Sequence, residues 1–113
     1  MKAAKKARGL RFDKNLTLEM LMDEIKPETK LDYIKRTIGP LQQHPDVLAT
    51  LKELFRQNHS LKKTAESMHI HINTLHYRLR KIEDLTGLGT GNAQQLFILY
   101  MACLLLDEHT NNH

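Results

Sequence analysis

The sequence predicts an all-α protein, a helical bundle of about six helices that contains a helix-turn-helix. Two observations lead to this fold class. Apolar residues recur at intervals of three and four along most of the chain, which is the period of an amphipathic helix, and no segment alternates as a strand does. The length of 113 residues suffices for one domain with a modest core.

Residues 1–15 are polar and basic, and we expect them to be a tail or a remnant of a preceding domain, with residues 16–113 forming one helical domain that holds the helix-turn-helix at residues 60–87. Six basic residues against Asp13 give residues 1–14 a net charge of +5, while the whole chain carries +4. The remainder therefore sums to −1, so overall basicity is no evidence for nucleic-acid binding.

Three helices are expected before the central motif. The first covers residues 16–25. The second begins at Pro27 and stops at Gly39, because proline suits the first turn of a helix and glycine and proline interrupt its interior. The third has Pro45 at its first position and ends near Asn58, with an apolar stripe that would brace the motif from behind.

The stretch from residue 60 to residue 87 is predicted to form two helices joined by a tight turn. The first runs from about Leu61 to Met68 and is capped by the Ser60 hydroxyl. The second runs from about residue 72 to residue 86, begins at a His71 cap and is ended by a left-handed glycine. A short helix, a three-residue turn and a longer helix are the helix-turn-helix pattern.

The second helix of this motif has two unlike faces. Leu75, Leu79 and Ile82 make one apolar stripe, which we expect to face the core. Residues 56–81 hold six basic residues and one acidic residue, a local charge of +5 that suits phosphate binding. The candidate DNA-binding residues are Lys62, Lys63, His71, Ile72, Asn73, Thr74, His76, Tyr77, Arg80 and Lys81.

These candidates divide by expected role. Asn73, Thr74 and His76 lie near the start of the second helix and are expected to read base edges, whereas Lys62 and Lys63 hold phosphates. Arg78 lies at the edge of the apolar stripe, so either packing with an ion pair to Glu83 or Glu66, or a phosphate contact, fits its position.

The segment HIHINTLHYRLRKIEDLTGL, residues 69–88, is similar to the C-terminal domain of the PucR and CdaR (sugar diacid regulator) transcription factors, and residues 64–79 resemble a Fis-type helix-turn-helix. Matching positions are His71, Asn73, Thr74, Leu75, Tyr77, Arg78, Leu79, Ile82, Leu85, Thr86 and Gly87. The chain departs from the family at Ile72, where arginine is frequent, which puts one phosphate or base contact in question. The resemblance implies a C-terminal fragment of a bacterial regulator of sugar diacid genes, whose effector would bind in the missing N-terminal part.

Asn92 is expected to cap a final helix over residues 93–108. Because this helix is apolar almost all round from residue 96 to residue 106, we expect it to be the central core helix, in part a dimer interface, or both at once. We expect a homodimer, since helix-turn-helix proteins usually pair to read two half-sites. Leu105 and Leu106 would then belong to its surface.

Enzyme chemistry, cofactors and a metal site are not expected. The sequence has no Gly-rich phosphate loop and no Ser-His-Asp spacing. His69 and His71, with His76 nearby, lack the carboxylate or thiolate that would complete a zinc site. Cys103 is the single cysteine and is expected to be a buried thiol, and the absence of an 18-residue apolar run predicts no membrane span and a cytoplasmic protein.

Sequence-specific binding of double-stranded DNA is therefore the first hypothesis for the function. One alternative is a protein-interaction or dimerisation module built on the apolar last helix. The other is a Fis-like architectural DNA binder with little sequence preference.

Overall fold

The computed structural model describes residues 17–111, which form six α-helices and one 3-10 helix and no strand, so the all-α prediction is confirmed. The predicted tail, residues 1–15, lies outside the described residues. After a helix over residues 17–23, the elements are α2 (Pro27–Thr37), η2 (Gly39–Gln43), α3 (Pro45–Arg56), α4 (Leu61–Met68), α5 (Ile72–Thr86) and α6 (Ala93–Asn111).

The chain divides into two compact units, and the boundary between Leu31 and Asp32 falls inside α2. The described part of the first unit holds the helix over residues 17–23, which ends before the predicted end at residue 25 because residues 24 and 25 form a turn. The second unit holds the rest of α2 and all later elements, including the predicted helix-turn-helix.

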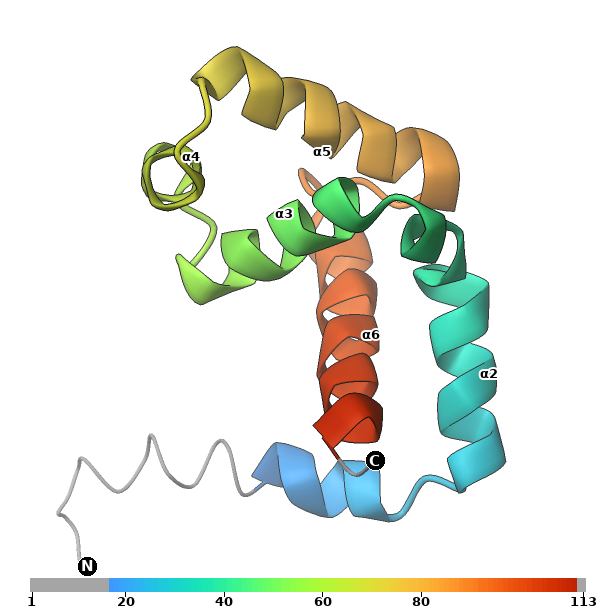
Figure 1. The fold of residues 1–113 in the computed structure, drawn as a ribbon. Helices are drawn as coiled ribbons and strands as arrows, with labels where there is room; N and C mark the ends of the chain where they lie inside the picture. The colour runs from blue at the N-terminus through green and yellow to red at the C-terminus, as the bar shows by residue number, and fades with distance from the viewer. Residues whose placement is uncertain (1–16, 112–113) are drawn as a thin grey trace, which may run out of the picture. The chain divides into compact units, whose positions relative to one another are not determined.

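The core of the second unit takes side chains from most of its helices. In Figure 1, α3 lies between α6 and the pair formed by α4 and α5, and the three helices α3, α4 and α5 contact one another pairwise. The largest fully buried side chains are Ile38, Leu41, Leu51, Leu75, Ile82, Leu99, Thr50 and Thr64. Burial of the isoleucine and leucine side chains among them is the main term that holds the helices together.

The element η2 was not predicted. The sequence suggested only that α2 stops at Gly39, but residues 39–43 continue as a 3-10 turn with proline near its start. This turn places Leu41 fully inside the core. It also contacts both α3 and α5, so it contributes to the base on which α5 lies.

The last helix is held from two sides within its unit. The rings of Phe55 on α3 and Tyr100 on α6 meet edge to face with their centroids 5.1 Å apart, and Lys52 Nζ lies 3.1 Å from Asp107 Oδ1. On the α2 side, the Tyr33 hydroxyl donates a hydrogen bond of 3.0 Å to a carbonyl oxygen of α6. These contacts give α6 the role of a core helix, one of the two alternatives raised by its composition.

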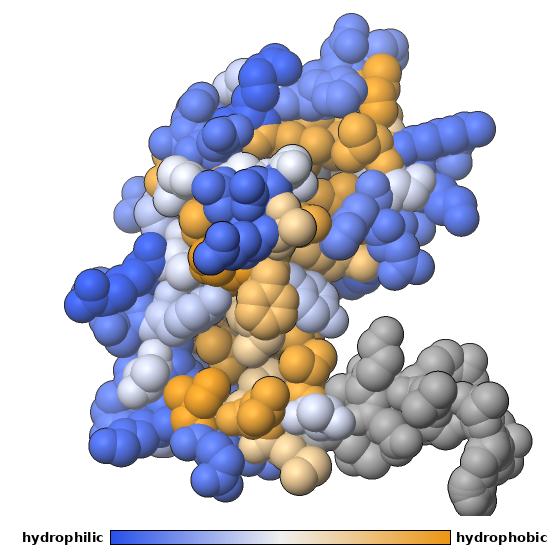
Figure 2. Space-filling model, turned by 180° about the vertical axis from the view of Figure 1, so that it is seen from behind, coloured by the Kyte–Doolittle hydropathy of each residue, from blue (hydrophilic) through white to orange (hydrophobic). Residues whose placement is uncertain are grey.

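The position of the α6 leucines corrects one expectation. Leu105 and Leu106 are only 3% and 8% exposed, so the prediction that they present a dimer surface is wrong. Phe97 is the α6 residue among the exposed large hydrophobic side chains, at 56%. Figure 2 shows apolar surface over α6 below the mostly hydrophilic surface over α5. No helix in the described part of the chain combines the length and apolar character needed to cross a bilayer.

Candidate DNA-binding interface

Helix α4 begins where the sequence predicts. The Ser60 side chain accepts a hydrogen bond of 3.1 Å from the backbone N–H of Lys63, which is the expected cap. The Thr64 hydroxyl, which is fully buried, donates to the Ser60 carbonyl at 2.7 Å. Lys62 and Lys63 are exposed in the first turn, which has no acidic residue, so positive charge gathers at the amide end of the helix. That arrangement attracts anions.

The turn between the two helices depends on two histidines, as expected. His69 adopts a left-handed conformation with φ of 57°, and the backbone N–H of Ile70 closes the end of α4 on the Ala65 carbonyl at 3.0 Å. His71 then starts α5, because its Nδ1 accepts the backbone N–H of Asn73 at 3.0 Å. Both helices of the motif therefore have the predicted bounds and caps.

Helix α5 turns one face to the core and one to solvent. Leu75 and Ile82 are fully buried and Leu79 is half-buried, as the predicted apolar stripe requires. On the opposite face, Asn73 and Arg80 are exposed, as is Tyr77, at 55%. The helix ends at Gly87 in the left-handed conformation, with φ of 76°.

All ten candidate DNA-binding residues are exposed or half-buried, and they lie on α4, the turn and α5. Within residues 17–111, the His71 side chain is the one of this set that has a hydrogen-bond partner. The other polar side chains of the set keep their donors and acceptors available for an external ligand. Such groups are exposed at no desolvation cost until a partner covers them.

Arg78 does not belong to this outer face. Its Nη1 donates to Thr50 Oγ1 on α3 at 3.2 Å, and the Thr50 hydroxyl in turn donates to the Asp46 carbonyl at 2.8 Å. Of the two roles left open by the sequence, the structure shows packing, but with Thr50 as the partner in place of Glu83 or Glu66. Arg78 therefore ties α5 to α3.

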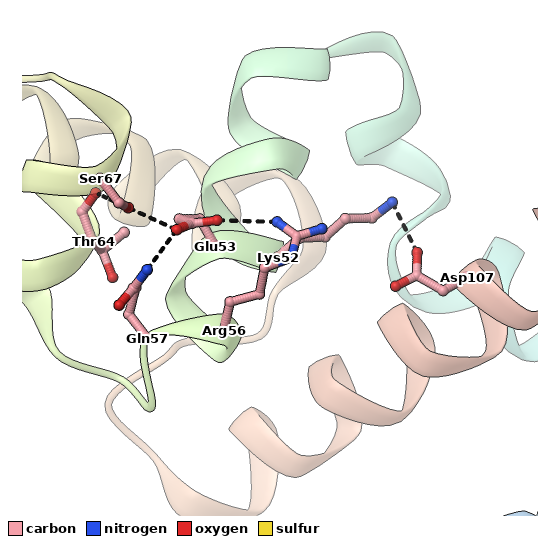
Figure 3. A network of polar contacts seen from close by, with 7 residues as sticks. All are labelled: Lys52, Glu53, Arg56, Gln57, Thr64, Ser67 and Asp107. Carbon is pink, nitrogen blue, oxygen red and sulfur yellow. Dashed lines mark hydrogen bonds and ion pairs between the residues drawn. The ribbon is translucent and has the colours of Figure 1, made fainter.

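Sequence reasoning also missed a polar junction between α3 and α4, drawn in Figure 3. Glu53 Oε2 accepts hydrogen bonds of 2.7 Å from Gln57 Nε2 and from Ser67 Oγ, and Glu53 Oε1 lies 3.1 Å from Arg56 Nη1. The bonds from Gln57, Ser67 and Arg56, in that order of effect, lower the pKa of Glu53 to about 2. The Gln57 spacing was visible in the sequence, but the contact with another helix was not.

Neither a metal site nor a reactive thiol is present in the part of the chain that the structure describes. No three His, Cys, Asp or Glu side chains of residues 17–111 are grouped so that they could hold a metal ion. Cys103 is buried, and burial raises the pKa of its thiol to about 12. A thiol in that state is a packed apolar group and not a nucleophile.

Three helices in mutual contact, with a capped α4, a tight turn and an exposed polar face on α5, define a helix-turn-helix domain. The chain belongs to the family described as the PucR C-terminal helix-turn-helix domain, whose sequence pattern matches residues 47–105. It is thus the DNA-binding type of domain found in transcriptional regulators, and this family is not one of enzymes. No solved structure matches the chain.

Three curated proteins illustrate the relationship. An uncharacterised protein of Bacillus subtilis, YsfB, is 41% identical over 99 residues, which cover 88% of this chain and 27% of that protein. The carbohydrate diacid regulator of Escherichia coli is 35% identical over 100 residues, covering 86% of this chain and 26% of the regulator. An uncharacterised protein of Haemophilus influenzae is 38% identical over 100 residues, covering 87% and 26%. The chain spans about a quarter of the length of these relatives.

Proposed function

We propose that the chain binds double-stranded DNA in a sequence-specific manner, by inserting the first turns of α5 into the major groove. The observation that carries this proposal is the exposed polar face of α5 beside the two lysines of α4, a face whose side chains have no partner among residues 17–111. In a helix-turn-helix, the second helix enters the groove and the first crosses the backbone. The family assignment supports the same use of these two helices.

The residues near the start of α5 supply the base contacts in this proposal. The Asn73 amide carries both a donor and an acceptor, which suits the paired acceptor and donor of adenine. Thr74 and His76 flank it with further hydrogen-bonding groups. Ile72 is 36% exposed at the first position of α5, where an apolar side chain suits contact with a thymine methyl group.

The cations around this helix supply the phosphate contacts. The basic members of the candidate set are Lys62 and Lys63 on α4, with the exposed Arg80 and the half-buried Lys81 further along α5. With the two remaining basic residues of the segment, Arg56 and Arg78, they make up its excess of positive charge. Arg56 and Arg78 have partners on the protein, which leaves four cations for DNA.

We further propose that the parent protein is a transcriptional regulator that binds DNA as a homodimer in the cytoplasm, where bacterial DNA lies. By likeness to the carbohydrate diacid regulator, its target genes would be genes for the utilisation of carbohydrate diacids. The effector would bind in the larger part of such a regulator that this chain does not match. Pairing of two copies would place two α5 helices about one DNA turn apart.

The test is a titration of the chain against a random-sequence 30-base-pair duplex at several salt concentrations between 50 and 200 mM. Contact of the four cations on α4 and α5 with four phosphates gives a slope of log affinity against log salt of about −3.6. Selection of duplexes from a random pool then tests specificity, and a preferred site bound at least about 1,000-fold tighter than random DNA is expected. Salt-independent binding or none contradicts the proposal, and equal affinity for all sequences indicates an architectural binder.

A further inference from the structure

Helix α5 is flanked by a different part of the protein on each side. On one side, a cavity of about 430 Å³ is lined by His76 and Arg80 of α5 together with Leu61, the first residue of α4. On the other side, a cavity of about 450 Å³ is lined by Tyr77 and Lys81 of α5 together with residues 43–47, where η2 meets α3. The candidate DNA-binding residues of α5 thus line two separate cavities, one on each side of the helix.

The width of the DNA major groove indicates what could lie against each side of α5. The major groove is about 12 Å wide and is bounded by two phosphate backbones, while a helix with its side chains is about 10–12 Å across. A helix seated in the groove therefore has one backbone beside each flank. On the His76 side lies Leu61, the residue before Lys62 and Lys63 on α4, so in the proposed function these lysines contact the backbone on that side. The backbone on the Tyr77 side would then meet η2 and the start of α3.

We propose that Lys81, Tyr77 and His44 form a second phosphate-binding site, so that the domain holds both backbones of the groove. This inference rests on the proposed function and adds the η2–α3 junction to the interface. Lys81 offers an ammonium group, Tyr77 a hydroxyl and His44 a ring N–H, all of which are donors to phosphate oxygens. In the described part of the chain none of these side chains has a hydrogen-bond or ion-pair partner.

Two neighbours define what this site can bind. Arg78 lines the same cavity, and its guanidinium donates to Thr50, so it adds positive charge beside the site while bonded to α3. Asp46 also lines the cavity, and its exposed carboxylate opposes an anion there. The net charge of the groups that line this cavity is positive and small, which suits one phosphodiester group better than a multiply charged ligand.

The salt dependence of binding tests the site directly. On the random-sequence 30-base-pair duplex, Lys81→Gln is expected to reduce the slope by about 0.9, so its loss of affinity between 50 and 200 mM salt is about 3.5-fold smaller than that of the unchanged chain. Lys63→Gln is expected to have the same effect, and the double variant twice the effect on the slope. Lys35→Gln, an exposed lysine on α2 outside both cavities, is the matched control and should change nothing.

Two further variants separate this site from a general loss of charge. Tyr77→Phe is expected to weaken binding without changing the slope, because it removes a donor and no charge. Asp46→Asn is expected to tighten binding to every duplex, because a negative charge beside the phosphate is removed. Circular dichroism of each variant confirms folding.

Neutral methylphosphonate groups placed singly along a selected duplex locate the contact. We expect a methylphosphonate to weaken binding at positions on both strands across the major groove. Lys81→Gln should abolish this weakening on one strand, and Lys63→Gln should abolish it on the other. If Lys81→Gln behaves like Lys35→Gln while Lys63→Gln weakens binding, the second site is wrong and the DNA-binding proposal stands. If the unchanged chain fails to bind any duplex, both proposals are wrong.

Discussion

Arg78 Nη1 of α5 and Thr50 Oγ1 of α3 lie 3.2 Å apart, and the Thr50 side chain is fully buried. The contact matches the one between Glu53 of α3 and Ser67 of α4, at 2.7 Å. Each helix of the motif is thus tied to α3 by one polar bond in addition to apolar packing. Because the angle of α5 decides which bases its side chains reach, α3 sets the geometry of the proposed interface.

Thr50→Val tests the first of these bonds. Valine keeps the shape of threonine but leaves the guanidinium of Arg78 without its acceptor, so the free energy of unfolding should fall by about 1–3 kcal/mol. Urea denaturation followed by circular dichroism measures this change. Thr110→Val, on the exposed end of α6, is the control and should lie within about 0.5 kcal/mol of the unchanged chain. Equal stability of the two variants would show that neither the Arg78 bond nor the bond from the Thr50 hydroxyl to the Asp46 carbonyl contributes to stability.

The Glu53 junction predicts a pH dependence of stability. Since the folded protein holds the pKa of Glu53 near 2, below its ordinary value of 4.5, the carboxylate stabilises the fold above about pH 4.5 and loses that effect as the pH falls toward 2. Glu53→Gln should therefore lower the melting temperature at pH 7, and the difference from the unchanged chain should shrink between pH 4.5 and pH 2. Glu66→Gln, an exposed change of the same charge on α4, is the control. A difference that stays constant with pH refutes this role.

Truncation of two large apolar side chains, one buried and one exposed, should lower the free energy of unfolding by very different amounts. Leu75 is fully buried on α5, so Leu75→Ala should cost about 2–5 kcal/mol of unfolding free energy. Phe97 is exposed on α6, so Phe97→Ala should cost less than about 0.5 kcal/mol. Urea midpoints of both variants decide the matter, and a larger loss for Phe97→Ala would mean that the side chain is covered in solution.

The single cysteine gives a chemical probe of folding. Burial raises the pKa of Cys103 to about 12, so little thiolate exists at pH 8 in the folded protein. A disulfide reagent such as dithionitrobenzoate should react slowly with the native chain and rapidly in 8 M urea. Leu75→Ala should raise the rate under native conditions, because it populates the unfolded state. Rapid labelling of the native chain would contradict a buried thiol.

The sequence predicted well what depends on neighbours in the chain. The bounds of α4 and α5 followed from the Ser60 and His71 caps and from the period of the apolar residues, and the structure has the same bounds. The cap of α6 was also expected, and the Asn92 side chain accepts the backbone N–H of Gln95 at 3.0 Å. These features involve residues two or three positions apart, which is why local patterns reveal them.

Contacts between distant residues were beyond the reach of such patterns. The Arg78 bond joins residues 28 positions apart and the Ser67 bond residues 14 apart, so no spacing rule indicates either of them. The place of residues 43–47 beside α5 depends on the 3-10 turn η2, for which the glycine and proline at its start were the sole local signal. The burial of Leu105 was missed because an evenly apolar helix does not show which side is covered.

The most direct test of the account compares Asn73→Ala with Lys63→Ala on a selected duplex and on random DNA. Asn73→Ala should cost about 1–3 kcal/mol on the selected site, relax the preference at one base pair and leave random DNA almost unaffected. Lys63→Ala should weaken both duplexes about equally and reduce the salt slope by about one unit. If the two variants instead show the same uniform loss, the outer face of α5 does not read bases.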